Sequence, residues 1–141
     1  NEDYVLLNET GMGRVHRLWL KGAKAGQRDA FVDELPGTPD NIRFDGEDTF
    51  WIAMPSLRAS IDLLAPLPRL RALLSFLPIP WLEAAAQPAS FVVGVNLEGE
   101  VIHNLQDQDN PFHYITGVTP CGDTLYLGSL ETEAIGILPK P

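Results

Sequence analysis

The sequence predicts an all-β protein that contains about three blades of a β-propeller and a short helical insertion. Short apolar segments of strand length are separated by turn residues, and 12 Gly and 12 Pro are spread along the 141 residues. The same succession of strands recurs about every 45 residues, which is the length of a propeller blade. A meandering β-sandwich with regularly spaced turns is the alternative that these observations leave open.

An acidic turn residue stands directly before a short apolar strand in each repeat. The three segments are 3–7, 48–52 and 123–127. In the first and third units the next apolar strand is centred 12 residues after the acid, at Val15 and Ile135. In the middle unit the step takes 44 residues, to Val92, so we expect an insertion of 32 residues there.

The remaining predicted strands complete three units, which we expect to be blades over 1–39, 40–112 and 113–141. These strands are 14–20, 30–33, 41–44, 90–95, 101–105, 114–118 and 134–138. A closed ring needs at least about four blades. The chain also opens at Asn1 without an initiator Met, so we expect a piece of a longer protein. The expected partner is the N-terminal half of the same propeller, as a separate or cleaved chain.

Residues 57–86 interrupt the strand pattern with leucines at spacings of three and four, which predicts two short helices. The helices are punctuated by prolines at 66, 68, 78 and 80. Three interpretations stay open for this segment: a cap packed on the propeller, a lid over a substrate pocket, and an anchor on a membrane surface.

Composition excludes some functions. Nineteen acidic and ten basic residues give a net charge of −9, so the chain lacks the basic footprint of a nucleic-acid binder. Cys121 is the only cysteine, which excludes an internal disulfide and a multi-cysteine metal site. The uncharged run 72–82 is shorter than the roughly 20 apolar residues of a membrane span. A secretory, periplasmic or membrane-associated location stays open.

Four segments carry a family resemblance, namely 3–10, 35–42, 48–54 and 122–129. The most specific is Leu-Pro-Gly-Thr-Pro-Asp-Asn-Ile at 35–42. Together they resemble the strictosidine synthase-like family along essentially the whole chain. The wider superfamily includes paraoxonases and gluconolactonases, which are six-bladed propellers. The resemblance therefore implies that this chain is the C-terminal half of a six-bladed propeller.

Asp40 and Asn41 are the predicted metal ligands. A carboxylate and a neighbouring amide oxygen are hard donors, which suit Ca²⁺ better than zinc. Calcium takes about 6–8 oxygens, so two residues make only part of a site. The resemblance implies that both residues bind a central Ca²⁺ or another divalent cation, with further ligands from earlier blades. Taken alone, the residues also allow Asp40 to cap the turn after Pro39.

The resemblance implies a calcium-dependent hydrolase of the arylesterase or lactonase type, acting on a small-molecule ester or lactone. The cation would polarise the carbonyl while a base activates water. His113, just before a predicted channel-side strand, is the candidate base, and a surface histidine is the alternative. Glu9 matches a recurrent acidic position in the family and is predicted to support the site from outside the ligand set.

Two other functions remain as alternatives. One is a non-catalytic, membrane-associated propeller that contacts the membrane surface through residues 57–86. The other is a strictosidine synthase-type enzyme that forms a C–N bond. The resemblance implies a catalytic glutamate at the channel-facing start of the last blade, where this sequence has Thr116. Because a threonine cannot act as that acid–base group at neutral pH, the synthase activity is disfavoured.

Overall fold

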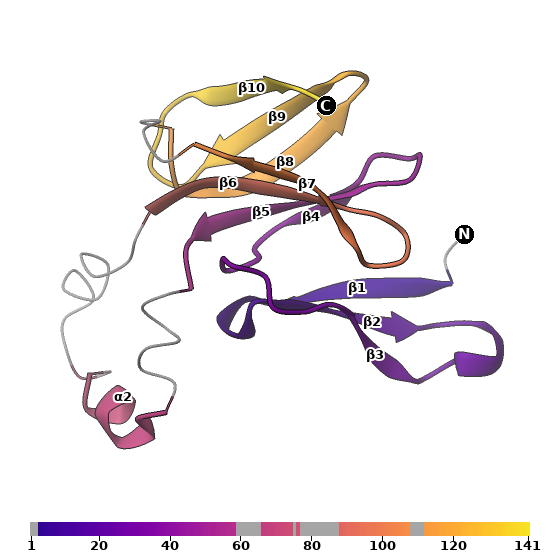
Figure 1. Cartoon of the computed structure of the whole chain (residues 1–141), viewed down its shortest axis with the longest axis horizontal. Helices are drawn as coiled ribbons and strands as arrows, with labels where there is room; N and C mark the ends of the chain where they lie inside the picture. The colour runs from indigo at the N-terminus through magenta and orange to yellow at the C-terminus, as the bar shows by residue number, and fades with distance from the viewer. Residues whose placement is uncertain (1–2, 59–65, 75, 77–87, 108–111) are drawn as a thin grey trace.

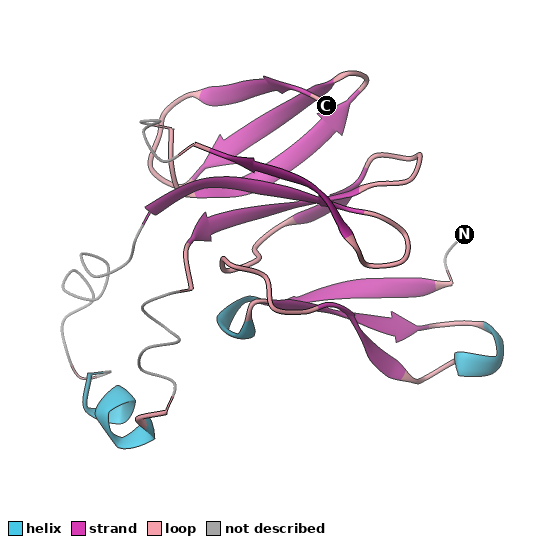
Figure 2. Ribbon diagram, in the orientation of Figure 1, coloured by secondary structure: helices cyan, strands magenta, loops and turns pink. Residues whose placement is uncertain are grey.

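The computed structural model describes residues 3–58, 66–74, 76, 88–107 and 112–141. In this part of the chain the strands form three antiparallel sheets, and helix is scarce (Figures 1 and 2). Sheet 1 contains β1 (Tyr4–Glu9), β2 (Arg14–Trp19) and β3 (Arg28–Val32). Sheet 2 contains β4 (Ile42–Phe44), β5 (Phe50–Ser56), β6 (Pro88–Val95) and β7 (Val101–Gln106). Sheet 3 contains β8 (Ile115–Cys121), β9 (Thr124–Ser129) and β10 (Ile135–Pro139).

The middle sheet is buried on both faces. Along β5, alternate side chains point to opposite sides because the side-chain period of a strand is two. Ile52 and Met54 join the apolar core with sheet 1, whereas Trp51 and Ala53 join the core with sheet 3. All four are at most 1% exposed. The three sheets therefore stack face to face, as propeller blades do, and the all-β prediction is confirmed.

The internal repeat is visible in the register of the sheets. Asp3, Asp48 and Asp123 come just before β1, β5 and β9. The third residue after the acid faces the following sheet in the first two units, as Leu6 and Trp51 do. Counted this way, β1, β5 and β9 are equivalent strands. Sheet 1 then lacks a counterpart of β4, and sheet 3 lacks a counterpart of β7, among the strands that the structure describes.

The insertion after β5 is described only in part. Leu57 forms a bridge with Gly37 and packs against the core between sheets 1 and 2. Helix α2 spans Pro68–Leu74 and is the helix described within the predicted two-helix insertion. The rest of that prediction falls at 59–65, 75 and 77–87, outside the described residues. Within the described part, no helix is long and apolar enough to cross a bilayer. The blade boundaries proposed from the sequence stay a prediction.

Candidate functional site

Asp40 and Asn41 are held at the entry to β4 by backbone pairing with β5. Asp40 N donates to Ala53 O at 2.9 Å, and Ala53 N donates to Asn41 O at 3.0 Å. Pro39, directly before them, is fully buried and fixes the approach of the chain. Both site side chains are exposed. Among the described residues the Asp40 carboxylate accepts no hydrogen bond, so its oxygens are available, and the turn cap that the sequence allows is not observed there.

The Asn41 side chain connects sheet 2 to sheet 3. Its Nδ2 donates to Thr116 O at 2.7 Å, and its backbone N donates to the same oxygen at 3.3 Å. Since a carbonyl oxygen can only accept, the nitrogen of this amide must face Thr116. The Asn41 Oδ1 therefore points away from Thr116 and remains available as an oxygen donor for a cation.

Asn8 brings sheet 1 to the same place. Its Nδ2 donates to the backbone oxygen of Asp40. Its Oδ1 is buried and has no hydrogen-bond partner among the described residues. An unpaired buried amide oxygen is costly, by about 1–3 kcal/mol, and calls for an explanation such as an absent ion, water or donor. Asn8, Asp40, Asn41 and Thr116 thus form one polar cluster, which we call the hub cluster, where the three sheets meet.

The oxygen donors of the hub cluster are of the type that binds a hard cation. They are too few to complete a calcium site by themselves. Its free oxygens are the Asp40 carboxylate and the amide oxygens of Asn8 and Asn41, which are the types that Ca²⁺ prefers. Calcium takes about 6–8 oxygens. Within the described residues, no group of three or more His, Cys, Asp or Glu side chains could hold a metal. A cation here needs ligands from outside the described part of the chain.

Glu9 lies on the other face of β1 from Asn8, since neighbouring residues of a strand point to opposite faces. Glu9 Oε2 lies 2.8 Å from His16 Nε2 and 3.4 Å from Arg14 Nε. Arg14 Nε also lies 3.6 Å from Asp33 Oδ1. Glu9 therefore belongs to a separate charged cluster in the structure, and its predicted supporting role is not tested by any contact with Asp40.

His113 stands just before β8, half exposed. Its Nε2 lies 3.5 Å from Glu131 Oε2, and its ring meets Tyr114 edge to face with the centroids 5.4 Å apart. Ser129 Oγ donates to His113 O at 2.7 Å and holds the backbone there. The structure does not bring His113 into contact with the hub cluster. It lies three residues before Thr116 in the sequence, and its role as base stays a prediction.

Asn8 lies in the segment 3–10 that carries part of the family resemblance, but the sequence did not predict it as a site residue. The signal that could have found it is the repeat itself. Asn8 stands five residues after Asp3, as Ala53 stands five residues after Asp48. Because Ala53 pairs with Asp40 and Asn41, its counterpart in the neighbouring sheet is a candidate for the same end of the molecule.

Comparison with known proteins identifies relatives along the whole chain. No family model matches. The chain is 31% identical to the adipocyte plasma membrane-associated proteins of Rattus norvegicus and Homo sapiens, over 95% and 93% of its length. It is 29% identical over its full length to the "Adipocyte plasma membrane-associated protein Hemomucin" of Drosophila melanogaster. It spans 38%, 33% and 30% of these three proteins, about a third of their length.

Proposed function

Because this chain belongs to the strictosidine synthase-like family, as a relative of the adipocyte plasma membrane-associated proteins, we propose that it contributes the Asp40–Asn41 half of the metal site of a calcium-dependent hydrolase. The observation that carries the proposal is the hub cluster, in which the free oxygens of Asp40, Asn41 and Asn8 come from two sheets to one place.

Each residue of the hub cluster has a distinct task in this proposal. Asp40 would supply negative charge, and Asn41 and Asn8 would supply neutral oxygens. Thr116 O orients Asn41 by accepting a hydrogen bond from its Nδ2, which would leave Oδ1 free to hold the ion. The bound cation would supply Lewis-acid polarisation of a carbonyl in an ester or lactone. The backbone pairing of Asp40 and Asn41 with Ala53 fixes the position of both ligands before any ion arrives.

His113 is the proposed base, with Glu131 as its orienting partner. A carboxylate beside an imidazole orients the ring, as in other hydrolytic sites. The separation of 3.5 Å between Nε2 and Oε2 is long for a hydrogen bond and is compatible with tightening when a substrate binds. Glu131 is 57% exposed, so the pair is open to solvent and to a ligand.

The remaining ligands would come from the N-terminal half of the propeller, whether as the same polypeptide or as a cleaved chain. The outward face of sheet 3 supports this, since Tyr126, Ile135 and Ile137 are apolar and 41–71% exposed there. The outward face of sheet 1 similarly presents Val5 and Leu7. Apolar sheet faces of this kind are normally covered, and in a propeller the next blades cover them.

The test uses a protein of family length, since the relatives extend well beyond the matched region. Calcium binding is measured by isothermal titration, and hydrolysis of phenyl acetate is measured with and without a chelator. Asp40→Asn should weaken calcium binding at least tenfold and reduce hydrolysis in parallel. Asp123→Asn, an exposed acid away from the hub cluster, is the matched control and should change neither. Equal calcium affinity in both variants would refute the metal-site proposal.

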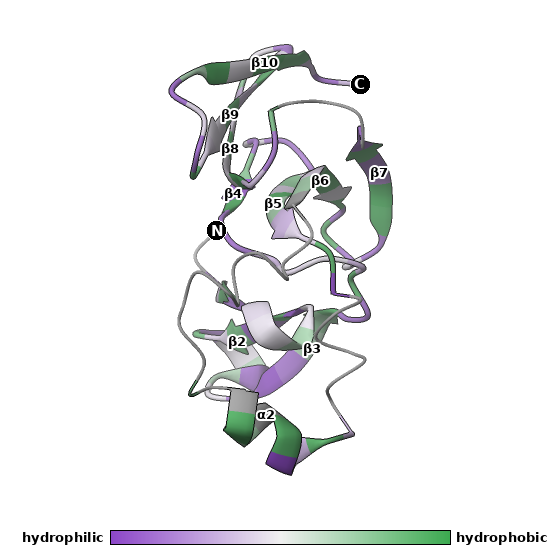
Figure 3. Cartoon of the chain, turned by 90° about the vertical axis from the view of Figure 1, so that its left-hand side faces the viewer, coloured by the Kyte–Doolittle hydropathy of each residue, from purple (hydrophilic) through white to green (hydrophobic). Residues whose placement is uncertain are grey.

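A second candidate function, attachment to a membrane surface through residues 57–86, is favoured by one observation. Leu67, Leu73 and Phe76 are 49%, 66% and 85% exposed. Figure 3 shows apolar residues along α2, and Figure 1 draws the helix to one side of the sheets. These exposed side chains favour an anchor or a lid over a cap packed on the propeller. Basic residues among them, such as Arg69, suit an anionic lipid surface.

Vesicle flotation separates this candidate from the first. The triple change Leu67→Asp, Leu73→Asp and Phe76→Asp should abolish flotation with phosphatidylserine-containing vesicles. Leu130→Asp alters an equally exposed leucine outside the insertion and serves as the control. Retained hydrolysis in the triple variant would identify an enzyme with an accessory anchor. Unchanged flotation would exclude the insertion as the membrane contact.

A C–N bond-forming synthase is the less favoured candidate. The resemblance places its acid–base carboxylate at position 116, where this chain has a threonine, whose side chain carries no carboxylate.

A further inference from the structure

We propose that Ser129 is a positioning residue, which holds the His113–Glu131 pair together and at a fixed place relative to the hub cluster. The inference rests on the function proposed above, because it gives Ser129 a role in that same reaction. Ser129 is the last residue of β9 and is half-buried. It acts through the backbone of its neighbours, which are the residues that carry the imidazole and the carboxylate.

The Ser129 hydroxyl joins two segments of the chain. Its Oγ donates to His113 O at 2.7 Å, since a carbonyl oxygen can only accept. The same Oγ accepts from the backbone N–H groups of Glu131 and Thr132, each at 3.1 Å. Thr132 Oγ1 lies 3.2 Å from it as well. One hydroxyl therefore fixes the backbone of both members of the proposed pair.

A backbone hydrogen bond strengthens this link one residue further along. Leu130 N donates to Tyr114 O at 3.0 Å. Tyr114 has φ +52°, in the left-handed region that a bulky side chain rarely adopts. Such a conformation costs free energy and persists only where the surrounding contacts hold it. The bonds to His113 O and Tyr114 O fix the peptide groups on both sides of Tyr114, so they hold this conformation and the direction of the chain at His113.

Ser129 also lies opposite the irregular start of β8. It pairs with Ile115, and the register then shifts between Ile115 and Gly117, so Thr116 is the extra residue of a β-bulge. A bulge re-aims the groups of the extra residue. Thr116 O is the oxygen that accepts Asn41 Nδ2 at 2.7 Å in the hub cluster. The strand pair that ends at Ser129 thus connects the His113–Glu131 pair to the predicted metal ligands.

The His113–Glu131 pair depends on this support because its own attraction is weak. His113 Nε2 and Glu131 Oε2 are 3.5 Å apart, and both side chains are open to solvent. Exposed ion pairs of this kind contribute little by themselves. A misplacement of about 1 Å can lower a catalytic rate by roughly 100-fold. The Ser129 hydroxyl, which fixes the backbone under both side chains, therefore decides where the base lies.

The test uses the protein of family length, as the calcium experiment does. Ser129→Ala removes the hydroxyl, and Ser129→Thr keeps it. In Ser129→Ala the kcat for phenyl acetate should fall at least fivefold, while KM and the calcium affinity stay within twofold. Ser129→Thr should recover at least half of the native kcat. Ser56→Ala is the matched control, because the half-buried Ser56 Oγ bonds Thr38 Oγ1 at 2.9 Å, and it should leave kcat unchanged.

A double-variant cycle separates positioning from a general loss of structure. In His113→Gln the proposed base is absent, so adding Ser129→Ala should lower kcat by less than twofold. A further fivefold loss in that background would show that Ser129 acts on the fold as a whole, and this result would overturn the proposal. A failure of Ser129→Thr to recover kcat beyond the level of Ser129→Ala would overturn it as well.

A second measurement does not depend on hydrolysis. In protein with ¹³C-labelled histidine, the ring signals of His113 are assigned by their absence in His113→Gln. Their nuclear Overhauser contact with the Tyr114 ring, whose centroid is 5.4 Å away, should be lost in Ser129→Ala and kept in Ser129→Thr and Ser56→Ala.

This measurement distinguishes failure of the inference from failure of the proposed function. Unaltered His113 signals in Ser129→Ala would overturn the positioning role, whatever the rates are. If those signals move in Ser129→Ala while His113→Gln retains full hydrolysis, the result would support Ser129 as the residue that holds the pair and would refute His113 as the base.

Discussion

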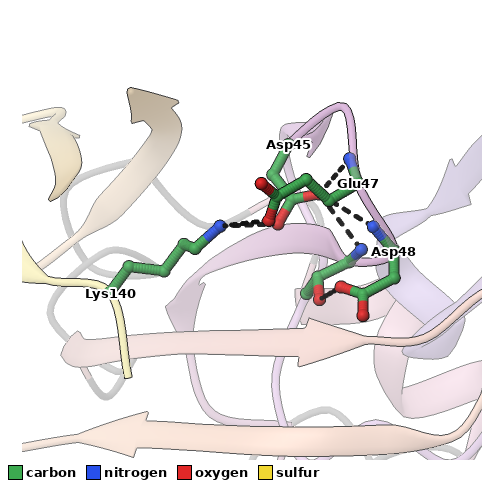
Figure 4. A network of polar contacts seen from close by, with 5 residues as sticks. Asp45, Glu47, Asp48 and Lys140 are labelled. Atoms are coloured by element: carbon green, nitrogen blue, oxygen red, sulfur yellow. Dashed lines mark hydrogen bonds and ion pairs between the residues drawn. The ribbon is translucent and has the colours of Figure 1, made fainter. Parts of the chain in front are cut away.

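Lys140 Nζ lies 3.2 Å from Asp45 Oδ2, so an ion pair ties the end of sheet 3 to the turn between β4 and β5 (Figure 4). The other carboxylate oxygen, Oδ1, accepts hydrogen bonds from the backbone N–H of Glu47, Asp48 and Thr49 at 3.0–3.2 Å. The Asp45 side chain is only 2% exposed. One buried carboxylate therefore closes a turn and joins two sheets.

Replacing Asp45 by Ala should lower the free energy of unfolding by about 1–3 kcal/mol, since it leaves three backbone N–H groups of the turn, including that of buried Thr49, without their acceptor. Asp45→Asn should cost less, because an amide oxygen can still accept from the turn. Urea titration followed by circular dichroism measures both. Equal losses in the two variants would show that the ion pair with Lys140, and not the turn, provides the stabilisation.

The same carboxylate should make stability depend on pH. Burial raises the pKa of Asp45, but the N–H groups of Glu47 and Thr49 and the Lys140 ammonium outweigh it, and the pKa is lowered overall. A lowered pKa in the folded state gives stability that is present above about pH 4 and is lost as the pH falls through the folded-state pKa. The difference in urea midpoint between the native chain and Asp45→Asn should therefore shrink below pH 4.

The pKa of Lys140 is shifted in the opposite direction to that of Asp45. Hydrogen bonds to Asp45 and Glu47 raise the pKa of its ammonium. Its contribution is complete below the ordinary lysine pKa and is lost as the pH rises through the raised value. The native chain should lose stability above pH 10 as Lys140 deprotonates, and Lys140→Gln should not show this loss. A gap between the two chains that stays constant through that range would contradict the ion pair.

Gly99, in the turn between β6 and β7, packs closely against Phe31 of sheet 1. It has φ +93°, and a Cβ there would overlap the backbone oxygen of Phe31. Gly46 has nearly the same φ, +91°, but a Cβ added to it would have no atom within 4 Å. Gly46→Ala should cost roughly 1–2 kcal/mol from backbone strain alone. Gly99→Ala should cost about 1–3 kcal/mol more from overpacking. Equal thermal unfolding midpoints would show that the two sheets are not in this contact.

Asn41 acts as a donor, which a paired substitution can test. Asn41→Asp removes the Nδ2 that donates to Thr116 O and should reduce the unfolding free energy by about 1–3 kcal/mol. Asn104→Asp is the matched control, because Asn104 Oδ1 accepts from Gln106 Nε2 at 3.1 Å and a carboxylate preserves that role. Similar effects of the two changes in urea titration would argue against the Asn41–Thr116 link.

Arg17 forms an ion pair with Asp29. The guanidinium lies over the Trp19 ring, 4.5 Å from its centroid, and makes two hydrogen bonds to Asp29 at 3.0 and 3.1 Å. The Arg17 and Trp19 hydrogen bonds lower the pKa of Asp29. In Arg17→Met the pKa of Asp29, followed by carboxyl NMR titration, should rise toward its ordinary value. A pKa that does not move would assign the effect to Trp19.

The sequence predicted the elements well for a physical reason. A strand segment is recognised by side chains that alternate in polarity with a period of two and by the turn residues that flank it. Both signals are local in the sequence. The segment 48–52 contains the first three residues of β5, and 123–127 contains most of β9. The acidic residue that recurs before each of these strands also predicted the arrangement of the sheets, since equivalent strands occupy equivalent places in successive sheets.

Only part of the candidate site could be predicted from the sequence. The resemblance singled out Asp40 and Asn41, and both stand at the entry to β4. Asn8 escaped notice because it reaches Asp40 only through the stacking of sheet 1 on sheet 2. Glu9, its neighbour, faces the other side of the strand and contacts His16. A one-residue difference in a strand reverses the face, and no local pattern states which face meets a ligand.

The amino-acid order by itself thus determined the strands and the repeat, because these follow from local spacing, and the family resemblance drew attention to the oxygen-rich pair at 40–41. Tertiary structure alone decided that Asn8 and Thr116 meet that pair and that Lys140 pairs with Asp45. Those relationships join residues up to 95 positions apart, and they exist only because apolar side chains on both faces of sheet 2 draw the neighbouring sheets against it.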